Sequence, residues 1–233
     1  MLSPVGLDAA SWRGITIEGV EPMSYEFPGF GGRERSPANA TIDRWVDELA
    51  AMLENTAGDP VHVVGCSLGG MVAQNLAVRH PDLVASMVLA CTGAAGSAAA
   101  SERADRTEQL GMAGVLDETL ERWFTWTTLL ANPLPPGVLY ARDTLLALDP
   151  GAFADGWRVI ATHDVLSRLT EIRIPVTCVA ATQDSAAPLS RVEEMRDAIP
   201  GAQLVKLPGA HIVYLENPGG FSTVLNEHLS ALI

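Results

Sequence analysis

Four short apolar runs alternate with longer segments in which apolar residues recur at helical spacing. The runs cover residues 60–65, 86–90, 175–181 and 203–207, and each has a helical pattern beside it. Short apolar runs bounded by turn residues are typical of buried strands, and strands that alternate with helices are typical of a parallel sheet. The pattern therefore predicts an α/β fold, with a mostly parallel sheet flanked by helices.

Three segments beside these runs have clear helical signals. Thr41 is a suitable N-cap for a helix that has its apolar side chains on one face and that ends at Gly58. A second helix is predicted directly after the first strand, over residues 68–79. Apolar residues at helical spacing between Phe221 and Leu232 predict a final amphipathic helix that packs on the sheet.

The pattern changes in the middle of the chain. Residues 93–104 form a connector of small residues, and helical patterns then cover residues 116–130, 138–148 and 152–163 with no strand between them. We therefore expect one α/β core from residues 1–93 and 165–233, interrupted by an all-helical cap over residues 94–164.

Composition narrows the class of protein. The chain has 233 residues, of which 48% are apolar, and its formal charge is −13 because 28 acidic residues face 15 basic ones. This apolar fraction excludes general disorder, and the acidic surface makes nucleic acid and anionic membranes poor partners. The three cysteines are far apart, and residues 1–12 have no secretory signal, so we expect a cytoplasmic protein.

The first predicted strand leads into a candidate nucleophile. Residues 65–69 read Gly-Cys-Ser-Leu-Gly, which is a GxSxG motif between a buried strand and a helix. Such a turn projects Ser67 from the carboxyl edge of the sheet at a helix N-terminus, where backbone N–H groups favour a developing negative charge. In isolation the motif also fits an ordinary turn, but its context favours a nucleophile.

A serine nucleophile needs a histidine base and an acid that orients the base. Of the five histidines, His211 is the one in a loop that follows a predicted strand, and Asp184 follows another. Taken singly, Asp184 fits a turn or a helix cap, and His211 fits a solvated loop. The order Ser67, Asp184, His211 is the order of the catalytic triad in α/β-hydrolases.

Further motifs resemble this superfamily. Residues 26–31 (Glu-Phe-Pro-Gly-Phe-Gly) are similar to its D-x-P-G-x-G loop, and Gly209 to His211 followed by Glu216 to Pro218 resembles its G-x-H and E-x-P motifs. Residues 121–125 (Glu-Arg-Trp-Phe-Thr) resemble the cap motif of the 3-oxoadipate enol-lactonases and related esterases. Residues 3–8, ahead of Trp12, look like their oxyanion loop.

This resemblance implies a serine hydrolase that cleaves a small carboxylic ester or lactone through an acyl-enzyme, without a metal or an organic cofactor. It also implies that the backbone amides of Val5 and Leu68 hold the oxyanion. The same triad serves C–C bond hydrolases, thioesterases and perhydrolases, and a non-catalytic binding protein of the same fold is the alternative from another class.

Aromatic residues concentrate in the predicted cap. Trp123, Phe124, Trp126 and Trp157 are candidates for a pocket over Ser67 that excludes water, and the alternative is that they form the core of the cap. The arginines of this segment, among them Arg122, suit either a carboxylate substrate or a solvated surface.

The N-terminus departs from the family pattern. Relatives have two or three strands before the oxyanion loop, whereas only Met1 and Leu2 precede it here. An empty place beside the nucleophile strand would leave buried backbone groups unpaired, at about 1–3 kcal/mol each. We therefore expect residues 22–27 to pair directly with residues 61–64, or a strand from a second copy to fill the place in a homo-oligomer.

Overall fold

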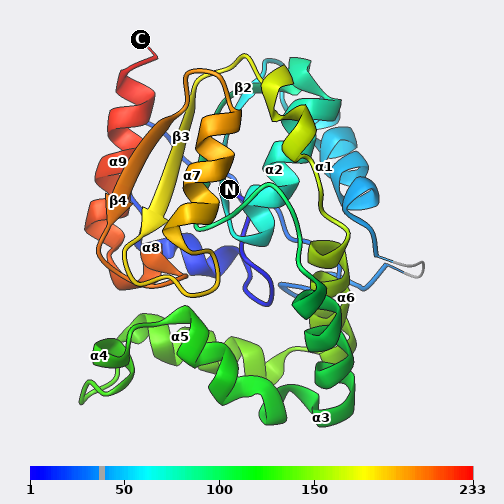
Figure 1. Cartoon of the computed structure of the whole chain (residues 1–233), viewed down its shortest axis with the longest axis vertical. Coiled ribbons are helices and arrows are strands. Elements are labelled where there is room, and N and C mark those ends of the chain that lie inside the picture. Colours follow the sequence, from blue (N-terminus) through cyan, green and yellow to red (C-terminus); the bar gives the residue numbers. More distant parts are fainter. Residues whose placement is uncertain (37–39, 233) are drawn as a thin grey trace.

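The sheet has four strands, all parallel, in the order β1 (Val61–Cys66), β2 (Val84–Ala90), β3 (Val176–Ala181) and β4 (Gln203–Leu207). The computed structural model describes residues 1–36 and 40–232. Helices flank the sheet (Figure 1), so the predicted α/β fold is confirmed. All four predicted apolar runs are strands, and the last of them has the bounds that the sequence indicates.

Burial explains the composition of the strands. Every residue of β3 is buried, and β2 has a single half-buried position, which is why both read as continuous apolar runs. β4 lies at one edge of the sheet and has only one buried residue. β1 begins half-buried at Val61 and is fully buried at the end that leads to Ser67.

The α-helices that flank or follow these strands have the following bounds. They are α1 (Ile42–Thr56), α2 (Leu68–Arg79), α3 (Ala98–Trp123), α4 (Trp126–Leu129), α5 (Pro136–Ala147), α6 (Pro150–Ala161), α7 (Leu189–Ala198), α8 (Val213–Glu216) and α9 (Pro218–Ser230). Short 3-10 helices cover Ala9–Gly14, Pro81–Leu83 and Leu166–Glu171. Thr41 caps α1 as predicted, with its side chain accepting a hydrogen bond from the Arg44 amide at 3.3 Å.

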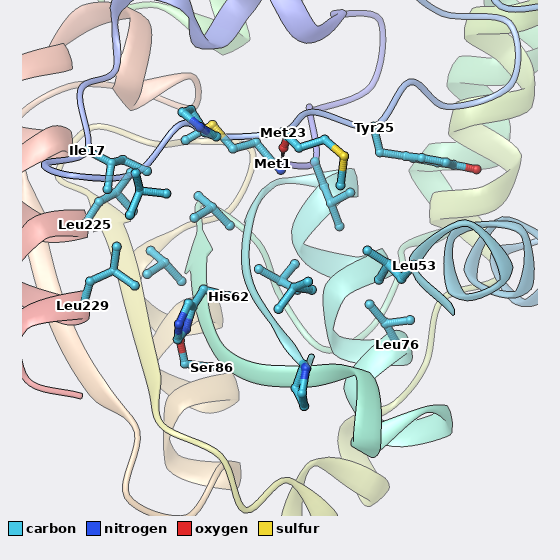
Figure 2. Close-up of a pocket in the computed structure, with 18 of the residues that line it drawn as sticks. Met1, Ile17, Met23, Tyr25, Leu53, His62, Leu76, Ser86, Leu225 and Leu229 are labelled. Atoms are coloured by element: carbon cyan, nitrogen blue, oxygen red, sulfur yellow. Dashed lines mark hydrogen bonds between the residues drawn. The ribbon is translucent and has the colours of Figure 1, made fainter. Parts of the chain in front are cut away.

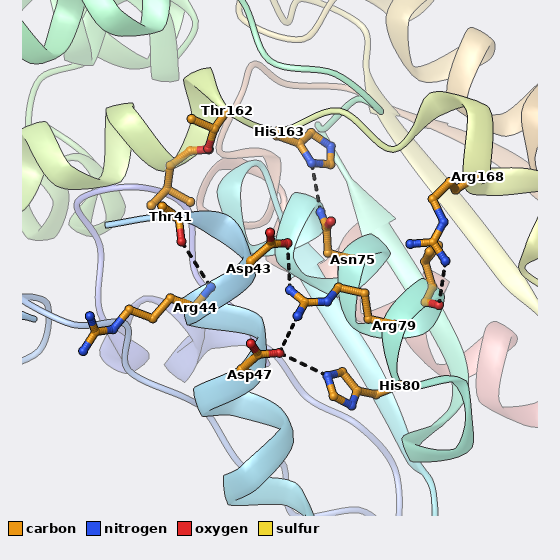
Figure 3. Close-up of polar contacts among 12 residues, drawn as sticks. Thr41, Asp43, Arg44, Asp47, Asn75, Arg79, His80, Thr162, His163 and Arg168 are labelled. Carbon is orange, nitrogen blue, oxygen red and sulfur yellow. Dashed lines mark hydrogen bonds and ion pairs between the residues drawn. The ribbon is translucent and has the colours of Figure 1, made fainter. Parts of the chain in front are cut away.

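Helix α2, which follows the turn of the GxSxG motif, lies in the core. It is buried from Leu68 to Val78, and α1 packs against it. At its exposed end, Arg79 forms ion pairs with Asp43 and Asp47 of α1, each at 2.7 Å (Figure 3). These ion pairs join the two helices on the solvent side, where exposed pairs contribute at most about 1 kcal/mol each.

The segment between β2 and β3 contains α3, α4, α5 and α6 and no strand. We call residues 98–161 the helical insertion; in Figure 1 its α3, α4 and α5 lie below the sheet. The expected connector is wrong in part, because α3 begins at Ala98, well inside it, where alanines favour a helix. Helix α3 bends at Gly111, whose φ of 68° is not helical. No helix among the described residues is long and apolar enough to cross a membrane.

The N-terminal residues occupy the place beside β1 that we expected residues 22–27 to take. The Leu2 amide donates to the Val64 carbonyl at 2.8 Å, and the Cys66 amide donates to the Leu2 carbonyl at 3.2 Å. On its other side, Leu2 forms a parallel bridge with Tyr25. The prediction that residues 22–27 pair directly with residues 61–64 is therefore wrong, because Leu2 lies between Tyr25 and Gly65.

Residues 61–64 of β1, together with Leu2, line one side of a pocket of about 370 Å³ (Figure 2). Its lining is mainly apolar and comes from β1, from α1 and α9, and from the segment between Ile17 and Tyr25. Ser86 and two histidines form a polar exception, since the Ser86 hydroxyl lies 2.8 Å from both His62 Nδ1 and His228 Nε2. The pocket lies at the edge of the sheet and contains none of the predicted catalytic residues. A strand from a second copy stays a prediction.

Candidate active site

Ser67 lies in the sharp turn between β1 and α2. Its φ of 52° and ψ of −116° are strained for a residue with a side chain, and the glycines two residues away on each side, Gly65 and Gly69, let the strand and the helix pack closely around the turn. A Cβ atom on Gly65 would overlap the backbone of Gly69, so the strand and the helix approach each other only without a side chain there. The strain directs the Ser67 side chain away from the sheet and out of the turn.

Two hydrogen bonds from β2 and its following residue hold this turn. The Ser67 amide donates to the Ala90 carbonyl at 2.9 Å, and the Thr92 hydroxyl donates to the Ser67 carbonyl at 2.8 Å. The backbone of Ser67 is therefore fixed by the sheet while its hydroxyl remains available for other contacts.

His211 brings together the serine and the acid that the sequence predicted. Its Nε2 lies 2.9 Å from Ser67 Oγ, and its Nδ1 lies 2.9 Å from Asp184 Oδ2. All three residues are buried, at 6%, 7% and 5% exposure for Ser67, Asp184 and His211. This is the geometry in which a histidine takes a proton from a hydroxyl while a carboxylate fixes its tautomer.

Asp184 is held as a charged acceptor. Its Oδ1 accepts hydrogen bonds from the amides of Ala186 and Ala187 at 2.7 and 2.9 Å, while Oδ2 faces His211. Burial raises the pKa of the Asp184 carboxyl, but the charge and hydrogen bond of His211 and the two amides outweigh it, so the net pKa lies below the usual value. The carboxylate can therefore stabilise a positive charge on the imidazole.

The loop that carries His211 is tied to the helical insertion. The Ile212 amide donates to the Trp123 carbonyl at 3.1 Å. Glu216 accepts from the Ala210 amide at 2.6 Å, and from both the amide and the hydroxyl of Thr125 at 2.9 Å. Sequence reasoning quoted Glu216 only as part of a motif, and its link to Thr125 depends on a contact between segments 91 residues apart.

The two predicted oxyanion donors lie on neighbouring segments. Leu68 is the first residue of α2, and Val5 belongs to the N-terminal loop. The two segments pack closely, because a Cβ atom on Gly69 of α2 would overlap the carbonyl of Leu2 in that loop. Val5 and Leu68 are both fully buried. Within residues 1–36 and 40–232, neither the Val5 amide nor the Leu68 amide donates a hydrogen bond. An oxyanion hole requires backbone amides that are free in this way. Their role in catalysis stays a prediction.

The predicted aromatic pocket is corrected by the structure. A cavity of about 40 Å³ opens at Ser67 and His211, and Trp157 lines it as predicted. Trp123 and Phe124 are buried elsewhere, outside the cavity lining, and Trp126 is 64% exposed on the short helix α4. The motif that contains Trp123 and Phe124 closes α3 and contacts the His211 loop, so their rings serve packing.

Sequence reasoning also missed two residues of this cavity. Besides Trp157, its lining includes Arg103 and Arg122 of α3 and Arg191 of α7. Arg122 was noted among the arginines of the predicted cap, whereas Arg103 and Arg191 carry no local signal that distinguishes them from surface residues.

The cysteine beside Ser67 does not compete as a nucleophile. Cys66 is fully buried, and its Sγ contacts the His211 carbonyl oxygen at 3.8 Å. Its neighbour Cys91 has a pKa well above the usual value, because of a hydrogen bond with Cys66 and because of burial. The Cys91 thiol is therefore protonated and packs in the core.

Comparisons with known proteins agree with this geometry. The model of a family described as "Alpha/beta hydrolase family" matches residues 4–224. A pimeloyl-[acyl-carrier protein] methyl ester esterase of Chromobacterium violaceum is 29% identical over 220 residues, which cover 88% of this chain and 82% of the relative. A 3-oxoadipate enol-lactonase 2 of Acinetobacter baylyi is 26% identical over 86% of this chain and 75% of its own length.

A solved structure resembles the fold over nearly the whole chain. The enol-lactonase from Burkholderia xenovorans LB400 has a TM-score of 0.92, with 24% identity, and the match covers 98% of this chain and 89% of that one. This match shows that the two chains share a fold.

Proposed function

Because the chain belongs to the alpha/beta hydrolase family, we propose that this hydrolase cleaves a small carboxylic ester or lactone through an acyl-enzyme on Ser67. The observation that supports this most strongly is the pair of 2.9 Å contacts that join His211 to Ser67 Oγ and to Asp184 Oδ2. Curated relatives with esterase and enol-lactonase names support the same class of reaction.

In the first half of the reaction, Ser67 Oγ attacks the carbonyl carbon of the ester. His211 Nε2 accepts the hydroxyl proton, and Asp184 stabilises the resulting imidazolium through Nδ1–H. The amides of Val5 and Leu68 donate to the carbonyl oxygen as it becomes an oxyanion, and loss of one such donor costs about 10²- to 10³-fold in turnover. His211 then returns the proton to the leaving alkoxide, and the C–O bond breaks.

In the second half, a water molecule attacks the acyl carbon of the Ser67 ester. His211 accepts a proton from the water and returns it to Ser67 Oγ as the acid product leaves. A lactone follows the same steps, except that its leaving alkoxide remains attached to the acyl group. His211 moves every proton, between Ser67, the leaving alkoxide and water, so the proposed reaction consumes only the ester and water.

The test of this proposal is covalent labelling of the serine. A fluorophosphonate probe should label the wild-type chain at Ser67, and the Ser67→Ala variant should not react. His211→Ala should lose nearly all labelling while it keeps its fold, as measured by circular dichroism. A folded wild-type protein that neither reacts with the probe nor hydrolyses any of a panel of 4-nitrophenyl esters and small lactones would overturn the proposal.

A further inference from the structure

Three arginine side chains line the small cavity at Ser67. Arg103 and Arg122 belong to α3, and Arg191 belongs to α7, which lies outside the insertion in the chain. The cavity has a volume of only about 40 Å³, so these side chains and the reacting hydroxyl share one confined space. Three cations close to a serine nucleophile require an explanation, because burying a guanidinium without a partner is unfavourable.

These arginines differ from most of their counterparts on the surface. Within the described part of the chain, no carboxylate lies within 4.0 Å of the guanidinium groups of Arg103, Arg122 or Arg191. By contrast, Arg158 of the same insertion pairs with Glu108 at 2.8 Å. The three arginines of the cavity thus lack the carboxylate partner that most arginines in the described part of the chain have, and Arg13 and Arg173, which do not line the cavity, lack one as well.

The acids nearest to Arg122 already have other partners. Glu118 and Asp184 both act on Arg122 electrostatically. However, Glu118 forms an ion pair with Arg106 at 3.1 Å, and Asp184 is bound to His211 at 2.9 Å. Burial, followed by repulsion from Arg103, lowers the pKa of Arg122 to about 10, so this group is still positively charged at neutral pH.

A tryptophan holds two of these cations in place. The guanidinium carbons of Arg103 and Arg122 each lie 5.3 Å from the centroid of the Trp157 ring, within the range of cation–π contact. Such contacts orient the groups without using up their N–H donors. Arg191 has one long contact, from Nη2 to the Gly96 carbonyl at 3.5 Å.

The same side chains form the boundary of a second space. Arg103, Arg122 and Trp157 also line a neighbouring cavity of about 200 Å³ among the helices of the insertion. An extended substrate can therefore have its scissile carbonyl at Ser67 and a charged end beside the arginines. Since one cavity of about 40 Å³ contains both groups, only a few bonds separate the carbonyl from the charge.

We propose that the substrate carries a carboxylate a few bonds from its scissile ester or lactone carbonyl, and that Arg103, Arg122 and Arg191 bind it. This rests on the proposed function and deepens it, because it names the substrate class of the same site. A carboxylate supplies the missing counter-charge, and its two oxygens match the paired N–H donors of a guanidinium. The arginines thereby select acidic esters and fix how far the acyl chain enters.

The experiment compares two esters that differ in charge. Monomethyl glutarate and methyl pentanoate are hydrolysed by the wild-type enzyme and by Arg122→Gln and Arg191→Gln in a pH-stat. We expect the wild type to have at least about 10-fold higher kcat/KM on monomethyl glutarate, as a charge-assisted hydrogen bond gives. Each variant should reduce the ratio of the two kcat/KM values by about 10-fold or more.

A matched control variant distinguishes the effect of removing any positive charge of the insertion from the effect of removing an arginine of the cavity. Arg142 lies in the same insertion, is paired with Asp143 at 2.9 Å and does not line the cavity, so Arg142→Gln should keep the wild-type ratio. A wild type without preference for the anionic ester, or variants that lower both kcat/KM values by the same factor, would overturn the proposal.

A second readout keeps the inference distinct from the proposed function. Glutarate should protect wild-type Ser67 from the fluorophosphonate probe at concentrations at which pentanoate does not, and Arg122→Gln should weaken this protection by about 10-fold. Labelling of Ser67 without such protection contradicts the carboxylate site alone. Absence of labelling contradicts the nucleophile itself.

Discussion

Glu216 and Thr125 join the loop of the candidate base to the helical insertion, through two hydrogen bonds of 2.9 Å to one carboxylate oxygen. The other oxygen accepts from the Ala210 amide, directly before His211, at 2.6 Å. The carboxylate thus positions His211 without touching Ser67. It also couples the loop of the base to the segment that contains Arg122.

Replacing this carboxylate with an amide should slow the reaction. In Glu216→Gln one of the two oxygens becomes an NH₂ group, which cannot accept from the Ala210 or the Thr125 donor. Hydrogen bonds to charged groups contribute about 1.5–3 kcal/mol, so we expect kcat to fall by about 10-fold or more. Steady-state kinetics on a neutral ester measure this fall. Thr125→Val is the matched variant that keeps the amide contact to Glu216 and removes the hydroxyl contact, together with the bonds of that hydroxyl to Thr128. An unchanged kcat in both variants would exclude a positioning role.

The assignment of Asp184 as the orienting acid predicts a large kinetic effect of an uncharged isostere. Asp184→Asn places an amide NH₂ against His211 Nδ1, which favours the tautomer that cannot accept the Ser67 proton, and loss of such a carboxylate costs about 10⁴-fold in kcat. Asp164 is the control, because among the described residues its side chain has a single hydrogen-bond partner, the Leu166 amide, 3.4 Å from Oδ1. If Asp164→Asn were inactive and Asp184→Asn active, the assignment would be wrong.

We expect the folded protein to lose stability in mild acid because His163 is buried. Its ring is buried, with Nδ1 3.0 Å from Asn75 and Nε2 3.1 Å from the Gly93 carbonyl (Figure 3). Burial lowers the pKa of His163 to about 4, well below the 6.5 of an unfolded chain. The unfolded state therefore binds the proton first, so stability is complete above about pH 6.5 and falls as the pH approaches 4, by up to about 3 kcal/mol.

Urea denaturation at several pH values measures this effect. His163→Gln should flatten the loss of stability between pH 6.5 and 4, although it lowers stability at neutral pH. His80→Gln is the control, because His80 is partly exposed and lies 3.4 Å from Asp47. An identical pH slope in wild type and His163→Gln would show that another group controls acid stability.

Replacing Gly69 with alanine should lower the stability of the protein, although alanine usually stabilises a helix relative to glycine. A Cβ atom at this position of α2 would overlap the Leu2 carbonyl and push the N-terminal loop away from Ser67. Gly69→Ala should therefore cost about 1–3 kcal/mol of unfolding free energy. Gly219→Ala in α9, where nothing lies within 4 Å of the added atom, should be neutral or stabilising by up to about 1 kcal/mol. Thermal unfolding of the two variants measures the difference, and equal effects would contradict the close packing of Leu2 on α2.

Local signals made the strands and the polar triad predictable. β4 has its predicted bounds because turn residues flank a short apolar run on both sides. Ser67, Asp184 and His211 were recognisable because each follows a strand, and the carboxyl ends of parallel strands meet at one edge of the sheet. The distances of 2.9 Å between them follow from that topology.

Contacts between segments that are far apart in the chain could not be predicted from the sequence. Leu2 replaces the expected pairing of residues 22–27 because two residues are enough to bridge Tyr25 and Gly65, and no periodicity shows this. Trp126 and Trp157 both belong to the predicted cap, yet α4 leaves Trp126 exposed while α6 buries Trp157 beside the cavity. The unpaired state of Arg103 and Arg191 likewise depends on which acids are already bound elsewhere.

The central claim is that Ser67 becomes acylated during turnover, and mass spectrometry of a rapidly quenched reaction tests it most directly. During hydrolysis of 4-nitrophenyl butanoate, the peptide that contains Ser67 should gain the mass of one butanoyl group, and Ser67→Ala should show neither the adduct nor turnover. Turnover by the wild type with no acyl group on that peptide, and retained by Ser67→Ala, would contradict the account.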